Sequence, residues 1–153
     1  MRGIFIGLGS NLAYREINLA RAREMISSQC RIVHTSSIYE TQPLYNLDQP
    51  LFLNQVVEVE TDLSPAALLS FLLEIESKMG RVRTVKNAPR IIDLDLLLYH
   101  DVILNTLQLI LPHPLLQERE FVLVPLVEIN PYIIHPLLNK TMKELLDEIR
   151  TKK

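Results

Sequence analysis

The segment APRIIDLDLLLYH, residues Ala88–His100, is predicted to be a β-strand that carries two carboxylates in its middle. Apolar side chains occupy alternate positions along it, as on the core-facing side of a strand: Ile92, Leu94, Leu96 and Leu98. Asp93 and Asp95 then project together from the opposite face, roughly 6–7 Å apart at their attachment points. Because burying an unpaired carboxylate is unfavourable, the strand raises the question of what the two aspartates bind.

The segments that precede this strand predict an α+β fold with the element order β-α-β-β-α-β. Strands are expected at residues 4–8, 32–39 and 52–60, with helices at residues 14–29 and 65–79. The first strand is expected to end in a tight turn formed by Gly7, Gly9, Ser10 and Asn11. Ser64 and Pro65 mark the start of the second helix, and Gly80 marks its end. This order is typical of the ferredoxin-like sandwich, in which an antiparallel sheet carries its helices on one face.

The remaining residues predict a C-terminal extension to that fold. A short hairpin is expected around Asn105, a loop at residues 111–121, one or two helical turns at residues 121–129, and a closing helix at residues 142–149. With 153 residues, of which 48% are apolar, the chain is long enough for one compact domain spanning residues 1–153.

The composition argues against several classes of protein. The net charge of −2 provides no bulk attraction to nucleic acid or to an anionic membrane. Cys30 is the only cysteine, which rules out an intrachain disulfide and fits a reducing compartment. The first residues lack the apolar run of a signal peptide, and no window reaches the roughly 18 apolar residues of a membrane span. We therefore expect a cytoplasmic protein that binds neither nucleic acid nor membrane. A monomer is expected as well, although none of these features bears on the oligomeric state.

Magnesium is the cation that best explains the aspartate pair. Mg²⁺ is usually held by one or two carboxylates together with substrate phosphates. Arg81, Arg83, Lys86 and Arg90 lie in the loop before the strand, and arginine forks suit phosphate oxygens. This combination predicts a polyphosphate bound through metal and arginines. On these observations alone, two ordinary surface carboxylates after a solvated basic loop remain the alternative.

Three further residues are candidates for ligand binding. His113 lies between two prolines, with Arg119 downstream on the same loop; a surface histidine is the alternative. Asn54 lies among apolar neighbours in a predicted strand, where its amide can recognise the edge of a heterocycle; a hydrogen-bonded sheet asparagine is the alternative. The chain has no Walker A motif, no Rossmann glycine fingerprint and no plausible nucleophilic triad.

Six segments distributed along the chain form a recognisable set. In order they are GSNL (Gly9–Leu12), ETQPL (Glu40–Leu44), FLNQVV (Phe52–Val57), GRVR (Gly80–Arg83), KNAPRIIDLDLLL (Lys86–Leu98) and LPHPLLQEREFVLVPL (Leu111–Leu126). The set resembles the 6-hydroxymethyl-7,8-dihydropterin pyrophosphokinase family of folate biosynthesis. The resemblance covers nearly the whole chain, and its most specific part is the segment around the two aspartates together with the downstream Pro-His-Pro.

The resemblance implies an enzyme that transfers the β,γ-diphosphate of ATP to the hydroxymethyl group of the reduced pterin and releases AMP. It implies ATP as co-substrate and two Mg²⁺ ions held by Asp93 and Asp95. The catalytic positions of the family correspond here to Arg81, Arg83, Arg90, Asp93 and Asp95. Its ATP-binding positions correspond to Glu76, Arg83, Arg90, Leu96, Ile110, His113 and Arg119. Its pterin-binding positions correspond to Thr41, Pro43, Leu44, Phe52, Asn54, Asp93 and Phe121.

A few positions depart from the pattern of this family. Asn87 and Ala88 stand where many members carry an aromatic residue and a glycine, and Pro114 stands where members may carry tyrosine. Leu73 stands where some members have a polar adenine contact. Two competing hypotheses are a non-catalytic ferredoxin-like sensor of a nucleotide and a different Mg²⁺-dependent phosphotransferase that releases ADP or pyrophosphate.

Overall fold

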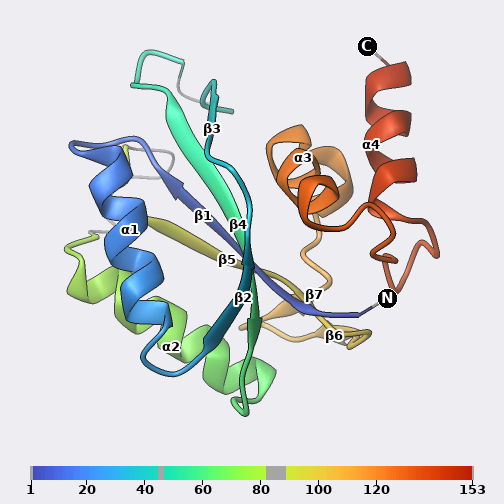
Figure 1. Ribbon diagram of the computed structural model, residues 1–153, viewed down its shortest axis with the longest axis horizontal. Helices are drawn as coiled ribbons and strands as arrows, with labels where there is room; N and C mark the ends of the chain where they lie inside the picture. Colours follow the sequence, from blue (N-terminus) through green and yellow to red (C-terminus); the bar gives the residue numbers. More distant parts are fainter. Residues whose placement is uncertain (1, 45–46, 82–88, 153) are drawn as a thin grey trace.

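The centre of the molecule is an antiparallel β-sheet (Figure 1). The computed structural model describes residues 2–44, 47–81 and 89–152. The strands of the sheet are β1 (Ile4–Ser10), β2 (Arg31–Thr35), β3 (Tyr39–Thr41), β4 (Phe52–Glu60) and β5 (Asp93–Tyr99). They lie in the order β2-β4-β1-β5, β3 also pairs with β4, and every pairing is antiparallel. The predicted ferredoxin-like fold class is therefore confirmed.

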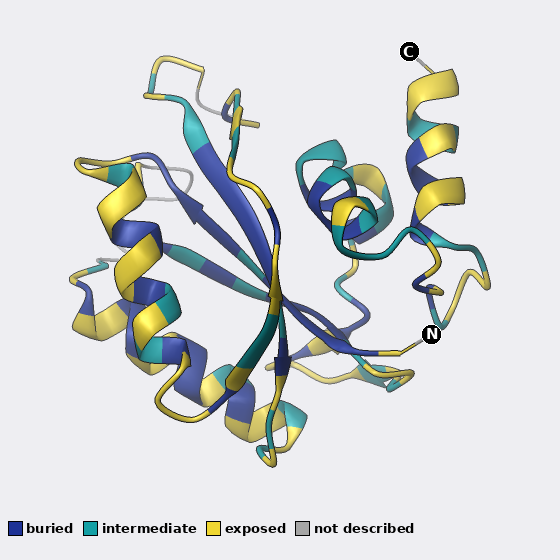
Figure 2. Cartoon of the chain, in the orientation of Figure 1, coloured by how far each residue is buried: buried dark blue, intermediate teal, exposed yellow. Residues whose placement is uncertain are grey.

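Helices cover both faces of this sheet (Figure 1, Figure 2). α1 (Arg15–Ile26) and α2 (Pro65–Lys78) bury one apolar core against the first face. α3 (Glu120–Ile129) and α4 (Met142–Thr151) bury a second core against the other face. The two helices of the βαββαβ core share one face, as predicted, and the C-terminal extension, for which no position was predicted, folds back as a second helical layer on the other face. None of the described helices is long and apolar enough to cross a membrane.

Local sequence signals place the ends of α2 where they were expected. The hydroxyl of Ser64 accepts a hydrogen bond from the N–H of Ala67 at 3.2 Å, and Pro65 is the first residue of the helix. Gly80 follows the helix with a φ of +90°, a conformation that glycine adopts without strain. These signals determine where the chain leaves the helix and turns toward β5.

The C-terminal extension is more regular than its sequence predicts. α3 has 10 residues, longer than the one or two turns expected there, and a 3₁₀ helix at Leu116–Glu118 interrupts the predicted loop. The hairpin expected around Asn105 is present as β6 (Leu104–Asn105) and β7 (Ile110–Leu111). α4 begins with a reciprocal capping box between Thr141 and Glu144.

The alternating pattern that predicted β5 breaks at a bulge. Ile6 pairs with Leu96 and Phe5 pairs with Leu98, so that Leu97 is an extra residue in the strand. Leu96 faces the core under α1 and α2, whereas Leu97 and Leu98 belong to the core under α3 and α4. The placement of Leu98 on the same face as Leu96 was wrong, because three consecutive leucines can supply both cores and conceal the bulge.

The glycines of β1 lie inside the strand rather than in the turn predicted for them. β1 continues to Ser10. A Cβ atom on Gly9 would lie 3.3 Å from the side-chain oxygen of Asn54 and 3.5 Å from the ring of Phe52. A Cβ atom on Gly7 would lie 3.4 Å from Leu97. The two glycines therefore leave space for large side chains on the neighbouring strands.

The strand predicted at residues 32–39 is divided in two. β2 ends at Thr35 and β3 begins at Tyr39. Between them, the hydroxyl of Ser36 accepts the N–H of Val56 at 3.0 Å, which takes the place of a backbone acceptor in the ladder. The interruption allows the chain to bend before it enters the loop that follows β3.

The second helical layer is expected to contribute to folding, and Leu123 tests this. Leu123 on α3 is 0% exposed, so its replacement by alanine should lower the free energy of unfolding by about 2–5 kcal/mol. Ile17 on α1 is 57% exposed, and Ile17→Ala should change that free energy by no more than about 0.5 kcal/mol. Urea unfolding measures both. A loss below about 1 kcal/mol for Leu123→Ala would mean that α3 packs only loosely on the sheet.

Candidate active site

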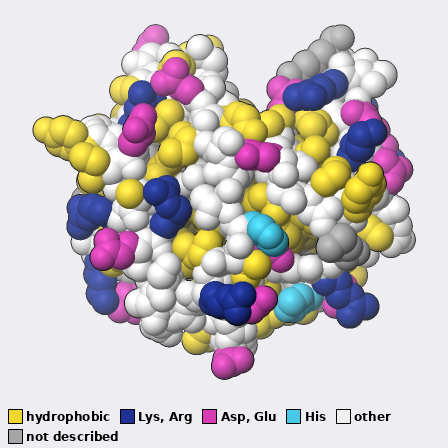
Figure 3. All heavy atoms as spheres, viewed as in Figure 1, with side chains coloured by type: hydrophobic (Ala, Val, Ile, Leu, Met, Phe, Trp, Pro, Cys, Tyr) yellow, Lys and Arg dark blue, Asp and Glu magenta, His cyan; other side chains and the backbone are white. Residues whose placement is uncertain are grey.

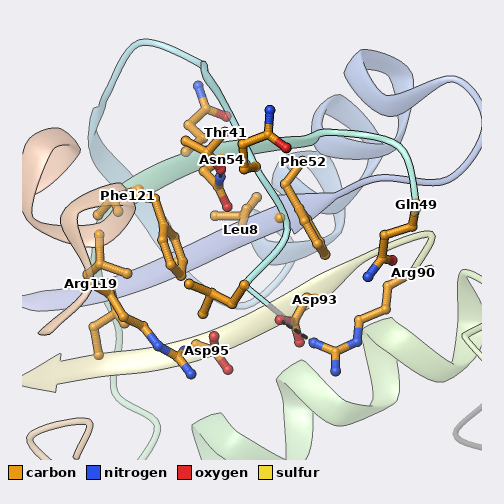
Figure 4. Close-up of a pocket in the computed structure, with 18 residues that line it drawn as sticks. Leu8, Thr41, Gln49, Phe52, Asn54, Arg90, Asp93, Asp95, Arg119 and Phe121 are labelled. Atoms are coloured by element: carbon orange, nitrogen blue, oxygen red, sulfur yellow. Dashed lines mark hydrogen bonds and ion pairs between the residues drawn. The ribbon is translucent and has the colours of Figure 1, made fainter. Parts of the chain in front are cut away.

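A cavity of about 470 Å³ lies on the α3 side of the sheet. Its floor is formed by β1, β4 and β5, and its sides by the loop after β3 and the start of α3 (Figure 4). Nine of the residues predicted from the sequence line it: Thr41, Leu44, Phe52, Asn54, Arg90, Asp93, Asp95, Arg119 and Phe121. The fold therefore brings together residues that are up to eighty positions apart in the sequence.

One part of the cavity has aromatic walls and an amide. The side chains of Phe52 and Phe121 lie on opposite sides of the cavity, with Asn54 between them at the back (Figure 4). The amide nitrogen of Asn54 donates a hydrogen bond to the hydroxyl of Thr41, which fixes the orientation of the amide. A flat heterocycle with polar edges would suit this space, because its faces need apolar contacts and its edge needs hydrogen bonds.

The other part of the cavity is ionic. One oxygen of Asp93 accepts from Arg81 at 2.7 Å and the other accepts from Arg90 at 3.1 Å. Arg81 also donates to Glu76 at 2.6 Å, and Glu76 accepts the N–H of Leu94 at 2.8 Å. The side chains of Arg81 and Glu76 are 9% and 2% exposed. Arg81 thus lies between two carboxylates instead of pointing into solvent.

The negative charge of Asp95 is less well neutralised by neighbouring side chains than that of Asp93. Its carboxylate makes no hydrogen bond or ion pair with any residue in the described part of the chain, whereas Asp93 has two arginine partners. Burial, followed by repulsion from Asp93, raises the pKa of Asp95 to about 7, and the positive charge of Arg119 opposes this shift. A cation bound at the pair would remove the repulsion between the two carboxylates.

The donor set fits magnesium better than a metal held entirely by protein. No group of three or more His, Cys, Asp or Glu side chains suited to a metal occurs among residues 2–44, 47–81 and 89–152. Two carboxylate donors that face a cavity match Mg²⁺, which keeps water and substrate phosphates among its ligands. Asp93 and Asp95 therefore fit the metal site predicted for them.

A second cavity of about 250 Å³ shares Asp95 with the first. Leu96, Ile110 and His113, all predicted to bind ATP, line it. Burial, followed by the charge of Arg119, lowers the pKa of His113 to about 4, so the ring is neutral at pH 7. Its Nδ1 accepts the N–H of Leu115 at 3.2 Å, which leaves the hydrogen on Nε2 as a donor. Asp95 thus lies where an apolar pocket and an ionic pocket meet.

Some predicted residues lie elsewhere. Arg83 is outside the described residues, as are Asn87 and Ala88. Pro43 is buried and does not line the first cavity, and the ion-paired Arg81 and Glu76 line neither cavity. The sequence reasoning missed Gln49, which lines the first cavity from the loop between β3 and β4. No local pattern marks it in that polar loop.

Comparison with known proteins assigns a family. Residues 5–131 match the model of the family described as 7,8-dihydro-6-hydroxymethylpterin-pyrophosphokinase (HPPK). The 2-amino-4-hydroxy-6-hydroxymethyldihydropteridine pyrophosphokinase of Bacillus subtilis is 46% identical over 127 residues, which cover 82% of this chain and 76% of that protein. The protein of the same name from Aquifex aeolicus is 38% identical over 148 residues, which cover 97% of this chain and 92% of that protein.

Other similar proteins are longer. The folic acid synthesis protein FOL1 of Dictyostelium discoideum is 42% identical over 142 residues, 93% of this chain but only 22% of that protein, so the chain spans about a fifth of its length. The crystal structure of Plasmodium falciparum HPPK-DHPS with pteroate has a TM-score of 0.78 at 16% identity, and the match covers 99% of this chain and 43% of that chain. That structure supports the fold alone. From the family match and the bacterial relatives, this chain belongs to the 7,8-dihydro-6-hydroxymethylpterin-pyrophosphokinase family.

Proposed function

We propose that this chain is a single pyrophosphokinase domain that transfers the β,γ-diphosphate of ATP to 6-hydroxymethyl-7,8-dihydropterin. The substrate hydroxyl oxygen forms a bond to the β-phosphorus, and the bond between that phosphorus and the oxygen of the α-phosphate breaks. AMP leaves, and the hydroxyl proton passes to solvent. The observation that carries the proposal is the position of Asp95, which borders both an aromatic-walled cavity and a second pocket containing His113. The family membership agrees with it.

The pterin is assigned to the cavity between Phe52 and Phe121. The two rings would contact the faces of the heterocycle, and Asn54, oriented by Thr41, would bind its polar edge. Leu44 lines the same cavity, and Pro43 supports the loop from a buried position. The hydroxymethyl group would then point toward the aspartates on β5.

ATP is assigned to the ionic part of the cavity and to the second pocket. Leu96 and Ile110 would contact the nucleoside, and His113, Arg90 and Arg119 would contact the phosphates. Arg81, Arg83 and Glu76 complete the proposed set. Asp93 and Asp95 would hold Mg²⁺, two ions in this proposal, and the metal would neutralise phosphate charge when bound. The chain itself supplies positioning and charge, as phosphoryl-type transfer requires, and needs no protein nucleophile.

Partners and location follow the same proposal: a cytoplasmic monomer acting on these two small molecules without nucleic acid or membrane. Basic and acidic side chains are interspersed on the face shown in Figure 3, and the net charge is −2. A basic patch of the kind that binds nucleic acid is therefore not seen on that face.

Phosphorus NMR of the protein with ATP, Mg²⁺ and 6-hydroxymethyl-7,8-dihydropterin tests the proposal. Stoichiometric AMP with a new pterin diphosphate signal supports it. ADP would instead identify an ordinary kinase, and pyrophosphate would identify a nucleotidyl transfer. If ATP bound equally well without Mg²⁺ and was not consumed, a nucleotide sensor would be favoured.

Asn54→Ala is expected to weaken pterin binding selectively. The amide is 7% exposed and faces the cavity, so its loss should raise the KM for the pterin by about 10- to 100-fold. The KM for ATP should change little, because Asn54 does not line the second pocket. Thr41→Val, which removes only the hydroxyl that orients the amide, should change the pterin KM in the same direction but less. Equal changes in both KM values would contradict the assignment.

A further inference from the structure

We propose that Asn11 is a positioning residue that holds the pterin side and the phosphate side of the cavity in register; this rests on the proposed function. Asn11 follows the last residue of β1 and is 0% exposed. It belongs to the GSNL segment, none of whose residues is assigned to substrate or metal binding. Its side chain does not line either cavity.

The amide of Asn11 joins two segments that are distant in sequence. Its Nδ2 donates to the side-chain oxygen of Gln49 at 2.7 Å and to the carbonyl of Pro50 at 3.1 Å. Its Oδ1 accepts the backbone N–H of Arg90 at 2.7 Å. The backbone N–H of Asn11 donates to the carbonyl of Arg90 at 3.0 Å. These contacts, which we call the Asn11 bridge, span 38, 39 and 79 residues of sequence.

The hydrogen-bonding partners of Asn11 require an amide side chain at this position. The N–H of Arg90 can only donate, and the carbonyl of Pro50 can only accept, so the amide must present its oxygen to one and its nitrogen to the other. Aspartate lacks the donor half of this group, and alanine lacks both halves. The bridge therefore requires a side chain that donates and accepts at the same short reach.

Both segments joined by Asn11 carry parts of the proposed site. Gln49 lines the cavity, and Pro50 lies two positions before Phe52, the aromatic wall. Arg90 lines the same cavity beside Gln49 and pairs with Asp93 at 3.1 Å (Figure 4). The bridge thus sets the separation between the groups assigned to the pterin and those assigned to the phosphates. In a transfer between two bound substrates, that separation determines whether the attacking oxygen reaches phosphorus in line.

Asn18 provides a matched control in the same region. It is a buried asparagine, 7% exposed, whose Nδ2 lies within hydrogen-bond distance of Ser10 Oγ, the carbonyl of Leu12 and the carbonyl of Ala13. Its contacts stay within the turn after β1 and reach neither of the two distant segments. Its loss should lower stability without separating the two sides of the cavity.

The kinetic test compares Asn11→Ala with Asn18→Ala. Asn11→Ala is expected to lower kcat by about 10²-fold, because small misplacements of reactants have effects of that size. The dissociation constants of a non-hydrolysable ATP analogue and of 6-hydroxymethylpterin, each measured alone by calorimetry, should change no more than about threefold, since each half-site remains intact. Asn18→Ala should keep a kcat within about threefold of wild type. An unchanged kcat in Asn11→Ala, or a loss fully explained by weaker binding of one substrate, would overturn the proposal.

A second readout needs no turnover. Backbone hydrogen exchange should accelerate in both residues 47–53 and residues 89–93 in Asn11→Ala, and in neither segment in Asn18→Ala. Asn11→Asp keeps the acceptor for the N–H of Arg90 but places a second acceptor oxygen against the carbonyl of Pro50. It should therefore accelerate exchange only in residues 47–53. Gln49→Ala, which removes one acceptor of the Asn11 bridge without burying a charge, is the milder variant if Asn11→Ala fails to fold, and it should accelerate exchange in residues 47–53. Absence of AMP formation by the wild-type chain would refute the proposed function, whereas unchanged exchange in the Asn11 variants would refute the bridge itself.

Discussion

Replacing Asp95 with asparagine is expected to reduce diphosphate transfer by more than about 10³-fold, because it removes a proposed metal ligand where phosphate charge must be neutralised. The same change should make the metal-free protein more stable. The carboxylate of Asp95 is repelled by Asp93 and has no ion-pair partner within the described residues, so a neutral amide of the same shape relieves that repulsion. Activity and stability should thus change in opposite directions.

The dependence of stability on pH distinguishes this explanation from ordinary damage. The pKa of Asp95 is about 7 in the folded protein, against 3.8 as the ordinary value, so the unfolded chain releases this proton first. The stability that the protonated group provides is fully present below pH 3.8 and is lost as the pH rises through about 7. Urea unfolding in the presence of a metal chelator measures this. Between pH 3.8 and about 7, the free energy of unfolding of the wild type should fall relative to that of Asp95→Asn. If the stabilities of the two proteins changed with pH in parallel, the raised pKa of Asp95 would be contradicted.

Two further variants serve as controls for Asp95. Asp93→Asn should also abolish transfer, but it should lower stability, because Asp93 pairs with both Arg81 and Arg90. Asp101→Asn should leave transfer unchanged, since that side chain is 62% exposed and pairs with Arg2 at 3.4 Å outside the cavity. Full activity in both Asp93→Asn and Asp95→Asn would exclude the proposed metal site.

Arg119→Ala is expected to lower kcat/KM for ATP by about 10²–10³-fold, the usual effect of removing one group that stabilises developing charge. The guanidinium lies 5.7 Å from the centre of the Phe121 ring, and Arg119 lines the cavity that we propose for both substrates. Arg119→Lys should recover part of the activity, because it restores the charge but not the two-pronged geometry. A variant that keeps ATP use intact would show that the phosphates lie elsewhere.

The same variant should change the titration of His113. The charge of Arg119 is the second cause, after burial, that lowers the pKa of His113 to about 4. Arg119→Ala should therefore move this pKa upward, toward the ordinary value of 6.5, and Arg119→Lys should leave it low. The ring protons of His113 report this by NMR. Arg31→Ala, at a 75% exposed side chain paired with Glu60, should change neither the titration nor the kinetics.

Local patterns determined the order of the elements. Ser64 and Pro65 predict the start of α2, and the period of two predicts the strand that carries Asp93 and Asp95; both are confirmed. The motif set predicted the family, which the comparisons confirm. The roles of the individual site residues stay predictions, although most of those described line the cavities. These successes share a physical basis, since caps, strand alternation and short motifs depend on neighbours along the chain.

Only the tertiary structure decided how those elements meet. The bulge at Leu97, the close contacts over Gly9 and the second helical layer on the sheet all depend on which segments pair in space. Asn11 shows this most clearly, because its partners at Pro50 and Arg90 are 39 and 79 residues away. A short polar side chain after a strand has the same local signature whether it faces water or joins two loops. The sequence of this protein by itself therefore determined the type of fold and the candidate chemistry, whereas long-range packing decided the separation between the two halves of the site.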